Sequence, residues 1–216
     1  MGDGAVHPDA QGYILSAVSD DARRWRKEPG VRVDVDIHER GSLRVVCPDV
    51  VQLADGRHRM YFEARSAARP NVILSAVSDS AGLDFTLEPG LRVSSAETGF
   101  GAPRVVFVPT LQKWRMYTSV APVADPGMWE PGKPSAKHIL SALSEDGLQW
   151  ELEDGIRVPQ EYHLEAYSLY VRVRPPYAPS LPALSPGMSC VCFESRNSLL
   201  RTGLIRSVRS RLLRLL

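Results

Sequence analysis

The sequence predicts an all-β fold: an incomplete β-propeller built of four-stranded antiparallel blades, followed by a proline-rich and basic C-terminal tail. Three observations support this prediction. One segment recurs along the chain, short β-prone runs alternate with turn residues, and no helical period of useful length occurs before residue 190. Because each recurring unit holds four strand-like runs, the units are expected to be propeller blades.

The recurring segment begins with ILSAVSD at 14–20, returns as ILSAVSD at 73–79, and returns again as ILSALSE at 139–145. Each copy is followed by an aromatic residue and then by EPGVRV, EPGLRV or EDGIRV. The aromatic residues share one position in the blade, and we expect them to fill the space between neighbouring blades rather than to stack on a ligand. They are Trp25, Phe85 and Trp150.

The copies divide the chain into blades. Residues 13–33 are predicted to form the last two strands of a first blade, and residues 47–93 a complete second blade. Within the second blade, an Asp-Gly pair between apolar runs indicates a hairpin, and the later Pro-Gly pair indicates a bulge or bend.

Residues 102–158 are predicted to form a third blade, widened by a long loop at 121–137, and residues 165–173 the first strand of a fourth. Two whole blades and two partial ones do not close a ring. The propeller region, taken as residues 11–173, is therefore expected to be truncated.

Residues 174–216 differ in composition from the rest of the chain. Five prolines between 175 and 186 favour an extended linker, and residues 198–216 carry five arginines and no acid, with apolar residues at helical spacing. Such a basic amphipathic helix could contact an anionic membrane surface or a partner. The alternative is unrelated sequence that replaces the missing blades.

Composition excludes several classes of protein. The chain of 216 residues has a formal net charge of +1, which gives no general attraction to nucleic acid. No signal peptide or membrane-spanning run is recognised, and three cysteines do not form a disulfide framework. A cytoplasmic location is the default expectation, and the oligomeric state is not indicated.

The strand pattern P-x-V-V-x-L-x-D-G-x-x-R-M-Y, followed by I-x-S-A-x-S-x-D-G-x-x-W, resembles the five-bladed propellers of the arabinanase, levansucrase and invertase superfamily of glycoside hydrolases. The resemblance covers roughly residues 11–173. It implies a glycan in the central channel and two carboxylates that act as acid and as nucleophile or base. It also implies an acid immediately before the proline of an innermost strand.

That position is occupied by Cys47, by Ala102 and, in the fourth and weaker copy, by Glu165. Only Glu165 keeps a carboxylate, and Asp49, two residues after Cys47 on the same strand face, is the best local substitute. The candidate catalytic residues are therefore Asp49 and Glu165.

The candidate substrate-binding residues are Arg104 and Tyr167. Because Arg104 is the counterpart of Asp49 in the next blade, the alternative is that the two form a contact between blades. Glu63, in the MYFEAR run, is expected to be an exposed strand residue rather than a general acid.

No cofactor or metal is predicted, since the histidines are scattered and show no metal-ligand spacing. Glu161, His163 and Glu165 alternate onto one strand face and could hold a cation. The leading hypothesis is hydrolysis or binding of a carbohydrate in the central channel. The alternative is a non-catalytic propeller remnant that serves as a binding scaffold, and the isolated chain is expected to have negligible glycosidase activity.

Overall fold

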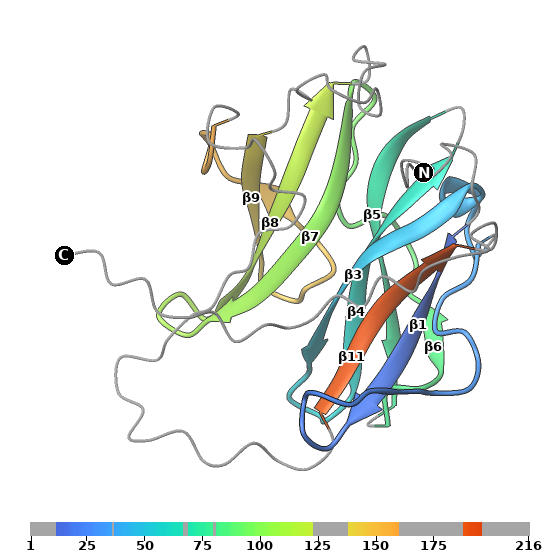
Figure 1. Cartoon of the computed structure of the whole chain (residues 1–216). Helices are drawn as coiled ribbons and strands as arrows, with labels where there is room; N and C mark the ends of the chain where they lie inside the picture. The colour runs from blue at the N-terminus through green and yellow to red at the C-terminus, as the bar shows by residue number, and fades with distance from the viewer. Residues whose placement is uncertain are drawn as a thin grey trace.

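The structure is a computed structural model that describes residues 12–35, 37–66, 69–79, 81–122, 138–159 and 188–195. These residues form strands and one short 3₁₀ helix, η1 (Glu39–Gly41) (Figure 1). The strands are β1 (Gly12–Ser19), β2 (Arg26–Lys27), β3 (Arg44–Gln52), β4 (His58–Ser66), β5 (Arg69–Ser78), β6 (Phe85–Leu87), β7 (Thr98–Val108), β8 (Lys113–Pro122), β9 (His138–Ser144), β10 (Glu151–Leu152) and β11 (Met188–Ser195). Within these ranges no helix is long and apolar enough to cross a membrane.

The second and third blades have the predicted four strands. In the second blade β3, β4, β5 and β6 pair antiparallel in chain order, and in the third β7, β8, β9 and β10 do the same. The predicted hairpin closes where the Leu53 amide donates to the Arg57 carbonyl at 2.8 Å. The all-β, bladed fold that the sequence predicts is thus confirmed.

The first blade contains a strand that the sequence analysis did not predict. β1 pairs with β2 as expected, but it also pairs along its whole length with β11, from Gly12 opposite Ser195 to Ser19 opposite Met188. β11 lies within residues 174–216, which were predicted to be a linker and tail outside the blades. In the structure residues 188–195 pair with one edge of β1. The corresponding edge of β5, in the second blade, is occupied by β4.

The recurring segment is explained by one bend made three times. In each blade the serine of ILSA donates to the glutamate that starts the later motif, at 2.6 Å in all three copies. The isoleucine of ILSA bridges the last valine of that motif, and the glycine between them has a φ of 82°, 82° or 85°. A positive φ of this size favours glycine, which explains why the motif keeps it. The pairs are Ser16–Glu28, Ser75–Glu88 and Ser141–Glu153.

The hydrophobic core lies between the blades. Ile14 and Val33 of the first blade pack in one cluster with apolar side chains of β4 and β5, among them Phe62 and Leu74. Tyr61 and Ile73, whose side chains leave the opposite face of the second blade, pack in another cluster with β7 and β8. Each blade is therefore held by burial against its neighbour, which is how a propeller is stabilised.

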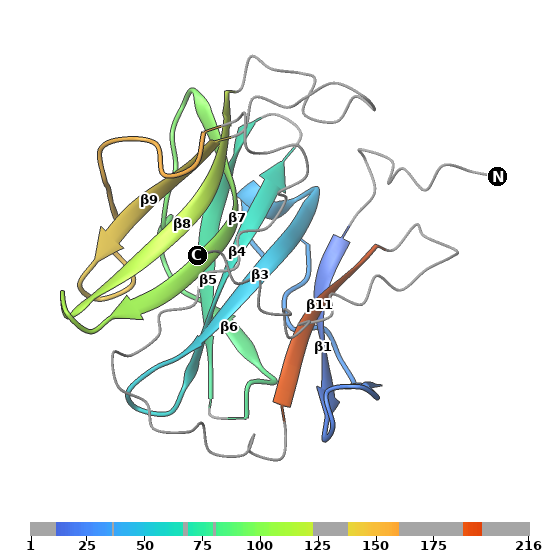
Figure 2. The same ribbon diagram turned by 60° about the vertical axis from the view of Figure 1, so that its left-hand side comes forward.

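Two of the three aromatic residues of the repeat lie in these interfaces, as predicted. Trp150 of the third blade meets Tyr61 of the second edge to face, with ring centroids 5.7 Å apart, and Phe85 packs against the cluster between the first and second blades. In both views the third blade and the β1–β11 pair lie at opposite ends of the fold (Figures 1 and 2).

Candidate functional site

The two innermost strands that the structure describes, β3 and β7, each contain a bulge at the same place. The register shifts between Val46 and Asp49 in β3, and between Gly101 and Arg104 in β7. Bulges of this kind re-aim side chains and are common beside active sites.

The residue before the proline in each bulge has a left-handed backbone. Cys47 has a φ of 53° and Ala102 a φ of 46°. A non-glycine residue in this region costs on the order of 1 kcal/mol, so the rest of the fold must hold both bulges in place. These are the positions where the resemblance implies an acid, and neither residue carries a carboxylate.

Asp49 lies just beyond the first bulge and contacts the next blade. Its Oδ2 accepts a hydrogen bond from the backbone amide of Val105 at 2.7 Å, and its Oδ1 lies 3.9 Å from Nη1 of Arg104. The contact between blades that was the alternative for Asp49 and Arg104 is therefore present. Whether Asp49 also acts in catalysis stays a prediction.

Burial and the neighbouring donors shift the pKa of the Asp49 carboxyl in opposite directions. Burial raises the pKa of the Asp49 carboxyl above its ordinary value, while the Val105 amide and the Arg104 guanidinium act in the opposite direction. The side chain still keeps 25% of its surface exposed. A carboxyl with a raised pKa and some solvent access has the properties of a proton donor.

Arg104 extends from β7 across to β3. Its Nη1 donates to the Pro103 carbonyl at 2.7 Å and, at 3.4 Å, to the carbonyl of Pro48. The side chain is 17% exposed. Arg104 thus joins the two proline-containing bulges and keeps its guanidinium next to Asp49.

Glu63 is the carboxylate that the sequence analysis misplaced. It was expected to be an exposed strand residue, but it is only 3% exposed. Three donors surround its carboxylate: the Ala102 amide at 3.2 Å, Nδ2 of Asn71 at 2.9 Å and Nε of Arg65 at 2.6 Å. A buried carboxylate requires such partners, so Glu63 holds β4 to the second bulge.

The signal that could have indicated this burial is Gly101. A Cβ atom at residue 101 would lie 2.5 Å from Oε2 of Glu63, so only glycine leaves room for the carboxylate. Gly101 immediately precedes Ala102, where the resemblance implies an acid. The need for glycine at residue 101 comes from Glu63, which belongs to the preceding blade.

The remaining predicted site residues lie outside the described residues. They are Glu165 and Tyr167, together with the possible cation ligands Glu161 and His163. Among the residues that the structure does describe, no group of three or more histidine, cysteine, aspartate or glutamate side chains could hold a metal ion.

Comparisons with known proteins agree with this architecture. No family model matches the chain, and no curated protein matches it in sequence. Among solved structures, fructan 1-exohydrolase IIa from Cichorium intybus is similar with a TM-score of 0.53 and 15% identity, over 72% of this chain and 28% of that one. A variant of that enzyme in complex with 1-kestose gives a TM-score of 0.54 at 15% identity, with the same shares of the two chains.

Sucrose-6-phosphate hydrolase from Lactobacillus gasseri is similar with a TM-score of 0.51 and 13% identity, over 66% of this chain and 29% of that one. These similarities show a shared fold, that of the five-bladed propeller glycoside hydrolases. This chain spans less than a third of the length of the structures that it resembles.

Proposed function

We propose that this chain is a glycoside-hydrolase-like propeller that holds a carbohydrate in the channel lined by β3 and β7 without hydrolysing it. The observation that carries the proposal is the residue type at the two bulges. Cys47 and Ala102 occupy the positions of the expected acid, and the nearest carboxylates, Asp49 and Glu63, accept hydrogen bonds from the backbone of β7. Glycoside hydrolysis needs two carboxylates at a fixed separation across the scissile bond.

A carbohydrate is the proposed ligand because enzymes of the same fold act on sugars, and one of them is known in complex with 1-kestose. Arg104 and Asp49 are the proposed contacts among the described residues, since a guanidinium donates to sugar hydroxyls and a carboxylate accepts from them. Tyr167 and Glu165, which lie outside the described residues, are proposed as further contacts.

The second candidate function is a non-catalytic scaffold that binds no sugar. The observation that favours it is the use of both Asp49 and Glu63 in holding neighbouring blades together. The two candidates differ in one measurable property, which is sugar binding.

Ligand-observed NMR with fructo-, arabino- and xylo-oligosaccharides tests the proposal. We expect saturation transfer to at least one of these classes, and we expect Arg104→Ala to abolish it. The matched control is Arg57→Ala, because Arg57 pairs with Asp55 in an exposed hairpin turn and its side chain is 53% exposed. Absence of saturation transfer to every sugar class would favour the scaffold and refute carbohydrate binding.

A further inference from the structure

The second blade holds the third through three donors that reach three consecutive carbonyls of one turn. The donors are Arg59, Tyr61 and Arg92, and the turn follows β9. The bonds are Arg59 Nη1 to the Asp146 carbonyl at 2.9 Å, Tyr61 Oη to the Gly147 carbonyl at 2.9 Å, and Arg92 Nη1 to the Leu148 carbonyl at 2.8 Å. Tyr61 also packs with apolar side chains of β7 and β8 in the cluster between the two blades, so the donors and the turn belong to one interface.

The third blade carries the same donors at the same register. In the second blade, Arg59 and Tyr61 of β4 lie opposite Val77 and Ser75 of β5. In the third blade, Arg115 and Tyr117 of β8 lie opposite the equivalent residues of β9, Leu143 and Ser141. The third donor, Arg157, occupies the position of Arg92 in the repeat. The third blade therefore displays a complete copy of the donor set that binds a turn.

The state of Arg157 differs from that of its counterparts. Arg92 is buried and donates to the following blade, as does Arg32 of the first blade, which reaches the Leu83 carbonyl. Arg157 instead donates to Ser141 at 2.6 Å within its own blade, and its side chain is 35% exposed. Among the described residues, no blade follows the third.

A matching acceptor turn lies at the other end of the fold. Asp21 Oδ1 accepts from the amides of Arg23 and Arg24, both at 2.8 Å. Asp146 Oδ1 accepts in the same way from the amides two and three residues further on, at 2.7 and 2.8 Å. Ala22, with a φ of 56°, stands where Gly147 has a φ of 73°. The turn at 21–23 therefore repeats the geometry of the turn at 146–148.

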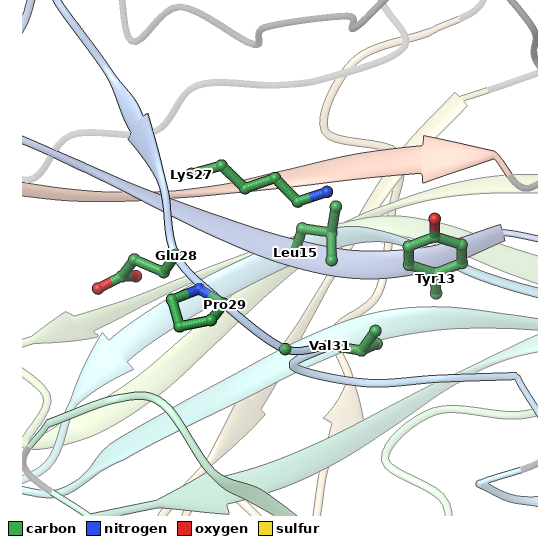
Figure 3. A pocket seen from close by; sticks show the side chains of 7 residues that line it. Tyr13, Leu15, Lys27, Glu28, Pro29 and Val31 are labelled. Carbon is green, nitrogen blue, oxygen red and sulfur yellow. The ribbon is translucent and has the colours of Figure 1, made fainter.

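Two further features belong to this acceptor face. Trp25 follows the turn at 21–23 in the sequence, as Trp150 follows the turn at 146–148. Trp150 is the ring that packs against Tyr61 of the second blade. The first blade also has a hollow of about 450 Å³ on the face of Leu15 (Figure 3). In the second blade the corresponding face, that of Leu74, is covered by the preceding blade. The hollow is lined by Tyr13, Leu15, Lys27, Glu28, Pro29, Gly30 and Val31.

We propose that these two faces bind each other between copies of the chain. The donor set of the third blade in one copy, Arg115, Tyr117 and Arg157, binds the carbonyls of residues 21–23 in a second copy, and Tyr117 packs against the second copy's Trp25. The turn at 21–23 has the same hydrogen bonds around its aspartate as the turn at 146–148, whose carbonyls the donors of the second blade bind. The partner that matches the donor set best is therefore a second copy.

The contact is heterologous, since different surfaces of the two copies meet. Two copies joined at both ends would bring six blades, three from each copy, into one ring, which is within the range of four to eight blades that propellers use. A contact that does not close produces longer chains of copies. This inference concerns assembly and does not depend on the proposed carbohydrate site.

Sedimentation velocity of the full chain at increasing concentration tests the inference. We expect the wild type to populate species of at least twice the monomer mass of 23.9 kDa. Arg157→Ala, at an exposed position, is expected to weaken association about tenfold or more, because a charged donor is lost. Tyr117→Ala and Trp25→Ala are each expected to give monomers, while the control Leu111→Ser, at a side chain 46% exposed and outside both faces, associates as the wild type does.

Mixing the two monomeric variants gives the sharpest result. The Tyr117→Ala copy keeps an intact acceptor face and the Trp25→Ala copy keeps an intact donor set, so the mixture is expected to form a heterodimer through one contact. Circular dichroism of each variant shows whether it is folded before mixing. A wild type that stays monomeric at every soluble concentration would overturn the inference and would point to another part of the chain or to a further blade as the occupant. Association unchanged in Arg157→Ala, Tyr117→Ala and Trp25→Ala, or a mixture of folded variants that stays monomeric, would also overturn it.

Discussion

Replacing Gly101 by alanine tests the contact that holds the second blade to the third at the bulge. The new Cβ would lie 2.5 Å from Oε2 and 2.9 Å from Cδ of Glu63, which is closer than carbon approaches oxygen or carbon in proteins. Because Glu63 is buried and tied to three donors, it cannot move aside without losing at least one of them. Overpacking costs about 1–3 kcal/mol and a lost charged hydrogen bond about 1.5–3 kcal/mol.

We therefore expect Gly101→Ala to lower the free energy of unfolding by about 2–4 kcal/mol in a urea titration. The control is Gly56→Ala, where nothing lies within 4 Å of the new Cβ and only the φ of +87° is unfavourable. That control is expected to cost about 1 kcal/mol.

A double-mutant cycle separates the steric cause from any other. In a Glu63→Ala background the carboxylate is gone, so Gly101→Ala is expected to cost less than about 1 kcal/mol there. An equal cost in the two backgrounds would show that the clash at residue 101 does not involve Glu63.

Three further predictions concern ionisation and the turns. Burial raises the pKa of Tyr61 from 10.0 to about 12, so this side chain ionises at a lower pH in the unfolded chain than in the folded one. The free energy of unfolding should therefore fall by about 2–3 kcal/mol in total between these two pH values. In urea titrations at alkaline pH, Tyr61→Phe should lack this part of the decline. Burial raises the pKa of Asp49 above 3.8, so the folded chain disfavours the ionised carboxylate. The free energy of unfolding of the wild type, relative to that of Asp49→Asn, should therefore fall as the pH rises above 3.8. A wild type that gains stability over the variant in this pH range would contradict the expected trend. Ala22 stands where the other two blades have Gly82 and Gly147, so Ala22→Gly should stabilise the chain by about 1 kcal/mol in thermal unfolding, and a lower melting temperature would count against the strain at this turn.

Much of the fold was predictable because the chain repeats it. Each copy of the repeat carries the isoleucine, serine, glutamate and glycine that form the bend, so three independent stretches pointed to the same local structure. The aromatic position was also predictable, because a large apolar residue at one place in every unit needs a common packing site. Trp150 against Tyr61 is such a packing contact.

The strand β11 was not predictable in the same way. Its eight residues follow a proline-rich segment and do not carry the repeat, and their pairing depends on the free edge of β1 at the other end of the sequence. When a strand forms by pairing with an edge far away in the sequence, the only local signal is the alternation of apolar and polar residues along the strand itself.

The candidate site was predicted only in part. The proximity of Asp49 and Arg104 followed from their matching positions in neighbouring blades, and the contact is present. The burial of Glu63 did not follow, because it depends on a missing Cβ at Gly101 in another blade. The left-handed conformations of Cys47 and Ala102 were not indicated either, since neither residue type favours a positive φ.

We propose that the channel holds a sugar and leaves it intact, and a turnover measurement tests this proposal. Purified full-length chain would be incubated with aryl glycosides, arabinans, fructans and xylans, and the released sugar quantified against a blank without protein. We expect no release above the blank from any substrate, including those that bind in the NMR experiment. Turnover that disappears in Asp49→Asn or in Glu165→Gln would contradict this expectation and would make that carboxylate catalytic.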